Sequence, residues 1–388
     1  MSPGRRLDIL LLITVLVLVS LGIIMVYSAS FAIAGERFRD AYHFLKKQAM
    51  AAGLGMVLMI LAAKLDYHRW QALAIPLLVL SAGLLGVLIF PGLRHEVGGS
   101  ARWLKFSFLS FQPAELAKLA LVIYLARSLT KKEGRMHSLK IGVLPHFIVL
   151  GGLFVLVLKQ PDFGTGIVFA ALVFILLFAA GARVLYLGAA VMAAVPVLFY
   201  IATRAHYRKG RLLAFLDPWK DPSDSGFQII QSFLAFGAGK LFGVGLGEGH
   251  QKLFYLPEVH TDFIFSVIGE ELGLLGVAVV IGLFLFLTWR GFRAAFRAAD
   301  PFGSYLALGV TLLIAVQALL NMGVVMGLLP TKGATLPFVS YGGTSLMINL
   351  MAVGILLNIS SQGAKGSDED HHHRRRDGRA FVPGAGSD

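Results

Sequence analysis

The stretch LDILLLITVLVLVSLGIIMVYSASF, residues Leu7–Phe31, decides the fold class because Asp8 is its only charged residue. A helix needs roughly 20 mostly apolar residues to cross a bilayer, and this stretch is long enough. The arginines before it are not followed by a cleavage-site pattern after the apolar run. We therefore expect a retained membrane span here and not a signal peptide.

Nine further apolar stretches follow along the chain. Helices are the expected spanning element because each one satisfies its backbone hydrogen bonds internally. The sequence therefore predicts an all-α, polytopic membrane protein with ten transmembrane helices in a single domain, residues 1–362. The nine stretches are Gln48–Ala63, Trp70–Phe90, Pro113–Ser128, Ile141–Leu158, Thr165–Ala180, Arg183–Ala202, Phe263–Trp289, Gly303–Leu328 and Thr344–Ser361.

The composition supports lipid as the solvent. The chain of 388 residues is 56% hydrophobic and 15% charged, whereas soluble domains are about one-quarter charged. Its net charge is +13, which fits anionic lipid, phosphate-bearing substrates and membrane topology, and we expect no nucleic-acid partner. Without cysteine, the chain forms no disulfide and no thiolate metal site.

The basic residues also predict the orientation. Counted over short loops, about twice as many lysines and arginines lie on the side that holds both termini, which places the termini in the cytoplasm. The outer side then carries three notable segments: Pro91–Gln112, the long loop 203–261 and Leu329–Gly343. Such long loops are usually functional. We expect the polar tail 363–388 to be disordered; its histidine run could alternatively bind metal.

Four of the ionisable residues within the predicted spans stand out, because charge is costly there and usually faces a cavity or a partner. Glu115 and Lys118 are one turn apart on the same helical face. They form either a structural ion pair or the wall of a polar cavity for a charged substrate. Glu270 and Glu271 need cations or polar partners, for which Lys118 and the arginines of the outer loops are candidates.

Two acids lie at the outer membrane surface. Asp162, in the turn KQPDFGT, either caps the following helix or serves as an active-site or cation-binding residue. Asp262, beside His260 and Thr261, lies where the long loop re-enters the membrane. It could cap the eighth span, act as a general base or bind a metal, and capping is compatible with either chemical role.

Basic and aromatic residues gather on the same side. A cluster after the seventh span suits a pyrophosphate or anionic headgroup, although an interfacial anchor explains it equally well. Trp103, flanked by Arg102 and Lys105, is either an interfacial aromatic or a platform for a sugar ring. The glycine-rich run GVGLGEG, residues 243–249, lacks the strand and helix context of a nucleotide loop. The basic cluster consists of Arg204, Arg208, Lys209 and Arg211.

Several longer motifs, in order, resemble one family: the shape, elongation, division and sporulation (SEDS) proteins. The resemblance runs through residues 7–361, and the motif PTKGATLP, residues 330–337, together with LDPWKDP, favours the division member of the family over the elongation member. The motifs are FQPAE (111–115), RLLAFLDPWKDP (211–222), GFQIIQS (226–232), YLPEVHTDFIFSVIGEELG (255–273) and FVSYGGTS (338–345).

The resemblance implies a peptidoglycan glycosyltransferase that polymerises lipid II at the outer face of the cytoplasmic membrane. By motif, the catalytic aspartate falls on Asp262, the expected general base. The functionally important tryptophan falls on Trp103, the intramembrane pair on Glu115 and Lys118, and a further acid on Asp162. Undecaprenyl pyrophosphate would leave, its charge neutralised by basic residues and by a divalent cation such as Mg²⁺ or Mn²⁺.

The family also implies partners at the division site. These are undecaprenyl-linked glycan, a class B penicillin-binding transpeptidase (FtsI-like) and other division proteins (FtsQ-, FtsL- and FtsB-like). Two alternatives belong to other functional classes: a lipid II flippase or transporter, and a non-enzymatic division scaffold. The enzyme is favoured because the acids gather at the outer mouth, and no charged residues clearly line the inner half of the spans.

Overall fold

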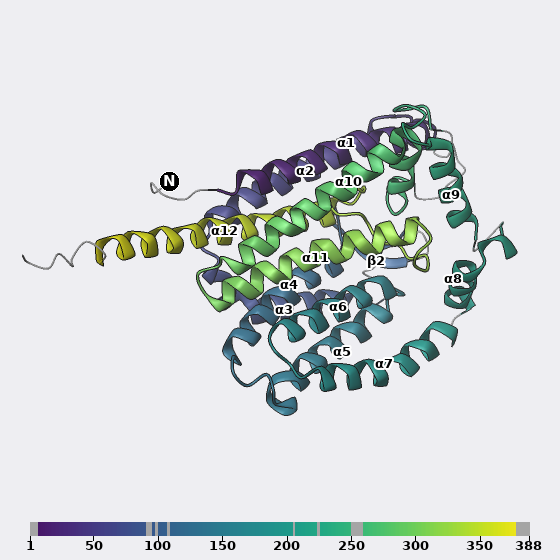
Figure 1. Ribbon diagram of the computed structural model, residues 1–388. Coiled ribbons are helices and arrows are strands. Elements are labelled where there is room, and N and C mark those ends of the chain that lie inside the picture. The colour runs from purple at the N-terminus through teal and green to yellow at the C-terminus, as the bar shows by residue number, and fades with distance from the viewer. Residues whose placement is uncertain are drawn as a thin grey trace, which may run out of the picture.

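The structure, a computed structural model, describes residues 7–90, 95–97, 100–106, 109–204, 206–222, 226–249 and 259–377. Its helices form one bundle, and both ends of the described chain lie at the same end of it (Figure 1). The helices are α1 (Ile9–Phe38), α2 (His43–Lys64), α3 (His68–Val87), α4 (Pro113–Lys131), η1 (Leu139–Val143), α5 (Leu144–Leu158), α6 (Phe163–Ala179), α7 (Val184–Arg204), α8 (His206–Leu216), η2 (Pro218–Lys220), α9 (Phe227–Gly239), α10 (Ile264–Phe296), α11 (Pro301–Val325) and α12 (Gly343–Asp377).

The all-α membrane fold predicted from the sequence is confirmed. Each of the ten predicted spans overlaps a helix, and among the described residues 7 helices are long and apolar enough to cross a membrane. Three shorter apolar helices are Phe163–Ala179, Val184–Val197 and Phe227–Gly239. The count of ten spans therefore stays a prediction.

Three details differ from the sequence analysis. The outer segment 91–112 contains a small antiparallel sheet of β1 (His95–Val97), β2 (Ser100–Phe106) and β3 (Leu109–Phe111), in that order. The long loop holds α8, η2 and α9. The tail is predicted to be disordered from residue 363, whereas α12 continues as far as Asp377; residues 378–388 of the tail lie outside the described residues.

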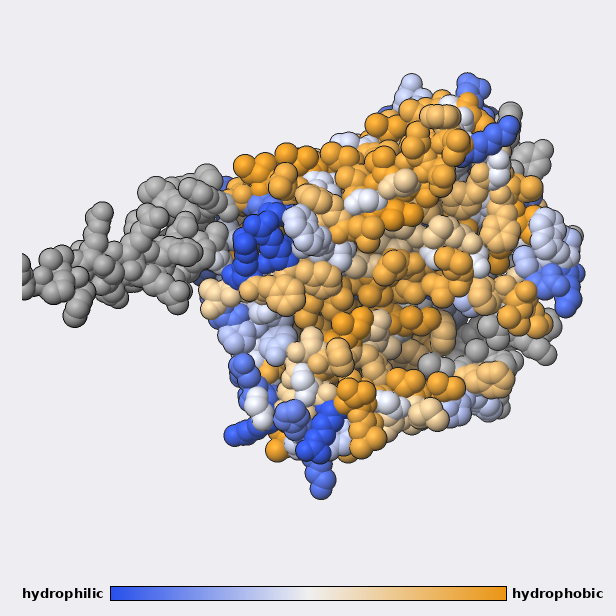
Figure 2. Space-filling view, viewed as in Figure 1, coloured by the Kyte–Doolittle hydropathy of each residue, from blue (hydrophilic) through white to orange (hydrophobic). Residues whose placement is uncertain are grey.

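The distribution of burial separates core helices from lipid-facing ones. In the most apolar part of α11 and of the α12 segment Gly343–Gly363, 72% and 78% of residues are buried, whereas in α3 the share is 22%. Figure 2 shows apolar side chains over the middle of one face and polar ones gathered toward its ends. This pattern fits a bundle whose outer helices meet hydrocarbon and whose core is formed by protein.

Glycine allows α2 and α12 to pack closely. A methyl group at Gly354 of α12 would lie 2.3 Å from the carbonyl oxygen of Met59 and 2.8 Å from Cβ of Ala62, both on α2. Small residues at such contacts let helix backbones approach in membranes, where van der Waals packing drives association. This contact fixes α2 against the core.

Helix α10 is broken at Gly273, near its N-terminal end. Gly273 has φ 65° and ψ −165°, a conformation that favours glycine. The freed backbone groups bond to the glycine-rich loop after α9: Leu274 N donates to Lys240 O (2.9 Å), and Val244 N donates to Glu270 O (3.0 Å). The run 243–249 thus has a structural role, with positive φ at glycines 243, 245 and 247.

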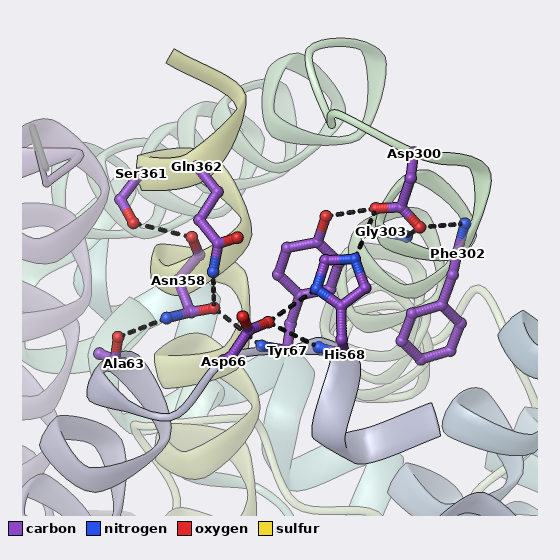
Figure 3. Close-up of polar contacts among 10 residues, drawn as sticks. All are labelled: Ala63, Asp66, Tyr67, His68, Asp300, Phe302, Gly303, Asn358, Ser361 and Gln362. Carbon is purple, nitrogen blue, oxygen red and sulfur yellow. Dashed lines mark hydrogen bonds and ion pairs between the residues drawn. The ribbon is translucent and has the colours of Figure 1, made fainter. Parts of the chain in front are cut away.

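At the end of the bundle where the termini lie, polar contacts hold the helices together (Figure 3). The Tyr67 hydroxyl donates to Asp300, which caps α11, while the Tyr67 amide donates to Asn358 Oδ1 (3.0 Å). His68 lies between Asp66 (2.7 Å) and Asp300 (3.6 Å). These bonds join the α2–α3 turn, α11 and α12.

Candidate functional site

Asp262 is half-buried and directly precedes α10, whose first residues lie at the end of the bundle opposite the termini (Figure 1). A methyl group at Gly333 would lie 2.8 Å from Asp262 Oδ2 and 3.7 Å from Nη1 of Arg102. The carboxylate therefore rests against the backbone of the loop between α11 and α12, beside the guanidinium of Arg102. Only glycine at position 333 leaves this space.

Asp162 caps α6 and faces the same guanidinium. It accepts hydrogen bonds from Thr165 N (3.1 Å) and Thr165 Oγ1 (2.7 Å). Nη1 of Arg102 lies 3.9 Å from Asp162 Oδ1, and Nη2 donates to Pro161 O at 2.5 Å. The capping interpretation of Asp162 is thus correct, and the residue also faces the site, so Arg102 links the surroundings of both acids.

Helix α11 holds the backbone on which Asp262 lies. Asn321 donates to Asp262 O (2.8 Å) and to Ala334 O (2.5 Å), which holds the Asp262 segment against the α11–α12 loop. One turn earlier, Gln317 accepts a hydrogen bond from Lys118, which also donates to Glu115 at 2.8 Å. The pair is buried between α4 and α11, so Lys118 is engaged here and not with the glutamates of α10.

Two basic residues lie at the α11–α12 loop, Arg211 reaching it from α8 and Lys332 belonging to it. Nη1 of Arg211, on α8, donates to Thr331 O at 3.2 Å. Lys332 extends across the first turn of α6, where a methyl group at Gly164 would lie 3.2 Å from its Cδ and 3.7 Å from Asp162 Oδ1. Burial lowers the pKa of Lys332 to about 8; the charge of Asp162 opposes that shift, and Lys118 adds to it.

The other predicted site residues have neighbours of their own, or have side chains outside the described part. Trp103 of β2 pairs with His95 and, as a neighbour of Arg102 on the strand, projects from the opposite face. His260 packs on Phe44, with ring centroids 4.4 Å apart, and 5.5 Å from the ring of Tyr341. The side chains of three residues lie outside the described structure: Lys105, Arg204 and Arg208.

The two buried glutamates of α10 belong to the helix break. Ser28 Oγ of α1 lies 2.7 and 2.6 Å from the two carboxylate oxygens of Glu271. A methyl group at Gly249 would lie 2.9 Å from Glu270 Oε2. These acids therefore contact a hydroxyl and the glycine-rich loop, and Lys118, one of their candidate partners, is bonded instead to Glu115 and Gln317.

Sequence reasoning missed Arg102, Asn321, Lys332 and Gly333 as site residues. Asn321 had a usable signal, because an amide within an apolar span is costly and usually has a partner. The importance of the other three follows only from contacts between segments distant in sequence. Together, the site offers a carboxylate beside fixed cations, which suits deprotonation of a hydroxyl and stabilisation of an anionic leaving group.

A metal cage is not evident in the described residues, among which no group of three or more His, Asp or Glu side chains could hold an ion. The guanidinium of Arg102 lies near both acids, where a cation would meet repulsion. We therefore derive no chemical step through a metal.

These features define a class: a polytopic membrane protein with a charged site at the end of its bundle opposite the chain termini. Comparison with known proteins identifies the family within this class. Residues 8–365 match the family model for FtsW, RodA and SpoVE, described as cell cycle protein. The chain belongs to this family.

Two relatives illustrate the range of similarity. The chain is 50% identical over 354 residues to a probable peptidoglycan glycosyltransferase FtsW of Trichlorobacter lovleyi, covering 91% of this chain and 93% of the relative. It is 42% identical over 353 residues to stage V sporulation protein E of Bacillus subtilis, covering 91% and 96%.

Solved structures share the fold. A chain from a structure titled "Structural coordination of polymerization and crosslinking by a peptidoglycan synthase complex" matches with a TM-score of 0.75 at 29% identity, covering 92% of this chain and 98% of that one. The rod shape determining protein RodA of Thermus thermophilus matches with a TM-score of 0.67 at 28% identity, covering 92% and 97%.

Proposed function

We propose that this protein is a peptidoglycan glycosyltransferase that polymerises lipid II, with Asp262 as the general base. The similarity to FtsW proteins over nearly the whole chain supports the activity. The observation that carries the role of Asp262 is its position, directly before α10 and against Gly333, with Arg102 beside it.

In this reaction, the 4-hydroxyl of the acceptor sugar attacks the anomeric carbon of the donor. The new glycosidic C–O bond forms as the bond to undecaprenyl diphosphate breaks, and the diphosphate leaves with the bonding electrons. The hydroxyl proton passes to Asp262. Direct displacement inverts the anomeric centre, and a second carboxylic acid is dispensable because the diphosphate is a good leaving group.

The surrounding residues have positioning, charge-supplying and substrate-binding roles in this proposal. Asn321 fixes the backbone of Asp262 through a 2.8 Å hydrogen bond, so it is a positioning residue. Arg102 supplies fixed positive charge beside the carboxylates. The buried Glu115–Lys118 pair continues this polar region into the bundle through Gln317. Trp103, His260, Lys105, Arg204, Arg208 and Arg211 stay predicted substrate contacts.

The cellular setting is part of the proposal. We place the protein in the bacterial cytoplasmic membrane with both termini in the cytoplasm, acting at the division site. A class B transpeptidase partner fits the similarity to a chain from a peptidoglycan synthase complex. A divalent cation, if used, would be held largely by diphosphate oxygens, as Mg²⁺ often is.

The test is polymerisation of lipid II by the purified protein with its transpeptidase partner, comparing wild type with Asp262→Asn. Asparagine preserves shape and removes the base, so we expect glycan chains from wild type and a loss of about 10²-fold or more in the variant. Thermal unfolding of both proteins controls for folding. Normal synthesis by a well-folded variant would refute the role of Asp262, and lipid II transfer across liposomes without glycan would favour a flippase.

A further inference from the structure

The ε-amine of Lys332 stands apart from the other cations of the site. Its Nζ is buried and has no hydrogen-bond partner among the described residues. Arg102 bonds to backbone carbonyls beside Asp162, Arg211 bonds to Thr331 O, and Lys118 is paired with Glu115. Among the described residues, Lys332 is thus a buried cation with no anion bonded to it.

The position of the side chain shows what faces the amine. Its stem lies over Gly164 at the start of α6, next to the carboxylate of Asp162. Asp162 already accepts two hydrogen bonds from Thr165, and no ion pair joins it to Lys332 within the described structure. The next residue, Gly333, touches Asp262. The amine is therefore close to the capping acid of α6, on a loop residue whose neighbour touches the proposed general base.

Buried charges are normally paired, because removing an ion from water without compensation is costly. An amine kept unpaired beside a reaction site is consistent with a partner that arrives with the substrate. Lipid II brings a diphosphate, and lysine is a common point-charge ligand for phosphate.

We propose that Lys332 binds the diphosphate of an undecaprenyl-linked substrate. This inference rests on the proposed function, because it takes the substrate class from it. Arg211 lies alongside, since its guanidinium bonds to the carbonyl of the residue before Lys332. The amine would complete its hydrogen bonding only in the loaded enzyme.

The ionisation of Lys332 gives this role a distinctive signature. Burial sets the pKa of the free amine to about 8, so it is mostly protonated at pH 7. An anion raises that pKa, so binding above pH 8 requires uptake of one proton, and affinity falls toward tenfold per pH unit as pH rises. Comparing Lys332 with arginine at the same position separates the lysine from the other charged groups around this part of the site. These are Asp162, Asp262, Arg102, Arg211 and the Glu115–Lys118 pair.

The experiment measures binding of undecaprenyl diphosphate to the full-length protein in nanodiscs, with undecaprenol as the probe lacking phosphate. Lys332→Gln should weaken diphosphate binding at pH 7 by about tenfold to hundredfold and leave undecaprenol binding unchanged. Lys332→Arg should retain binding and lose the decline above pH 8. Lys159→Gln, at an exposed lysine near the same outer turn, is the matched control and should bind as wild type.

Three results would overturn the proposal: wild-type affinity in Lys332→Gln, equal losses for undecaprenol and the diphosphate, or a pH decline that Lys332→Arg and wild type share. Failure of the proposed function is separate, because binding of undecaprenyl diphosphate is measured without polymerisation. Binding that depends on Lys332 without any polymerisation by wild type would contradict only the enzyme assignment.

Discussion

Substituting Gly333 by alanine tests whether the position of Asp262 controls catalysis. The new methyl group would lie 2.8 Å from Asp262 Oδ2, which is 0.6 Å short of the 3.4 Å at which ordinary contact begins. Either the carboxylate or the α11–α12 loop must move by about that distance. A misplacement of about 1 Å can cost about 10²-fold in rate, so we expect polymerisation to fall by about tenfold to hundredfold.

The backbone of Gly333 does not require glycine for its own conformation, because its φ is not in the left-handed region. The folded state should therefore persist, and the unfolding temperature should change little. Gly343→Ala is the matched control at the start of α12, since its methyl group would meet only Cβ of Ala51, at 3.5 Å. The assay is the initial rate of lipid II polymerisation for the three proteins. A Gly333→Ala rate within twofold of wild type would refute the reasoning.

Two further predictions concern stability, measured by thermal unfolding in detergent. Gly354→Ala should destabilise the protein by about 1–3 kcal/mol because its methyl group would lie 2.3 Å from Met59 O. Gly53→Ala is the control and should not destabilise the protein, because the space around Gly53 is open. Equal stability of the two variants would contradict close α2–α12 packing. Asp8→Ala should cost about 3–5 kcal/mol because it leaves Arg290, 2.6 Å away and largely buried, without its partner. A loss below 1 kcal/mol would show that this pair holds α1 to α10 only weakly.

Much of the helical fold could be predicted from the sequence, because long apolar runs carry their own signal. Leu7–Phe31 and Gly303–Leu328 are examples, and each overlaps a long helix. The predicted span Phe263–Trp289 hides a break at Gly273, because the interruption depends on hydrogen bonds to the loop after α9, 30 residues earlier. A hydropathy pattern describes only the local apolar character of the chain, so it does not reveal such a contact.

The candidate site was only partly predictable for a similar reason. Asp162 and Asp262 stood out as acids at predicted membrane surfaces, but the residues that surround them come from β2, α11 and the loop after it. Gly333 carries no chemical group, so only the approach of Asp262 reveals its importance. Lys332 carries no sequence signal that separates it from the other outer-loop cations, and only the structure shows that its amine is buried.

The broken helix has a consequence for building chimeras between relatives. The segment that begins α10 shares backbone hydrogen bonds with residues 240–245, and their glycines approach within a methyl group of each other's backbone. Neither segment keeps its backbone partners without the other. A graft that transfers the Asp262 segment from one protein to another must therefore carry residues 239–249 with it, and the two segments are expected to change together over evolutionary time.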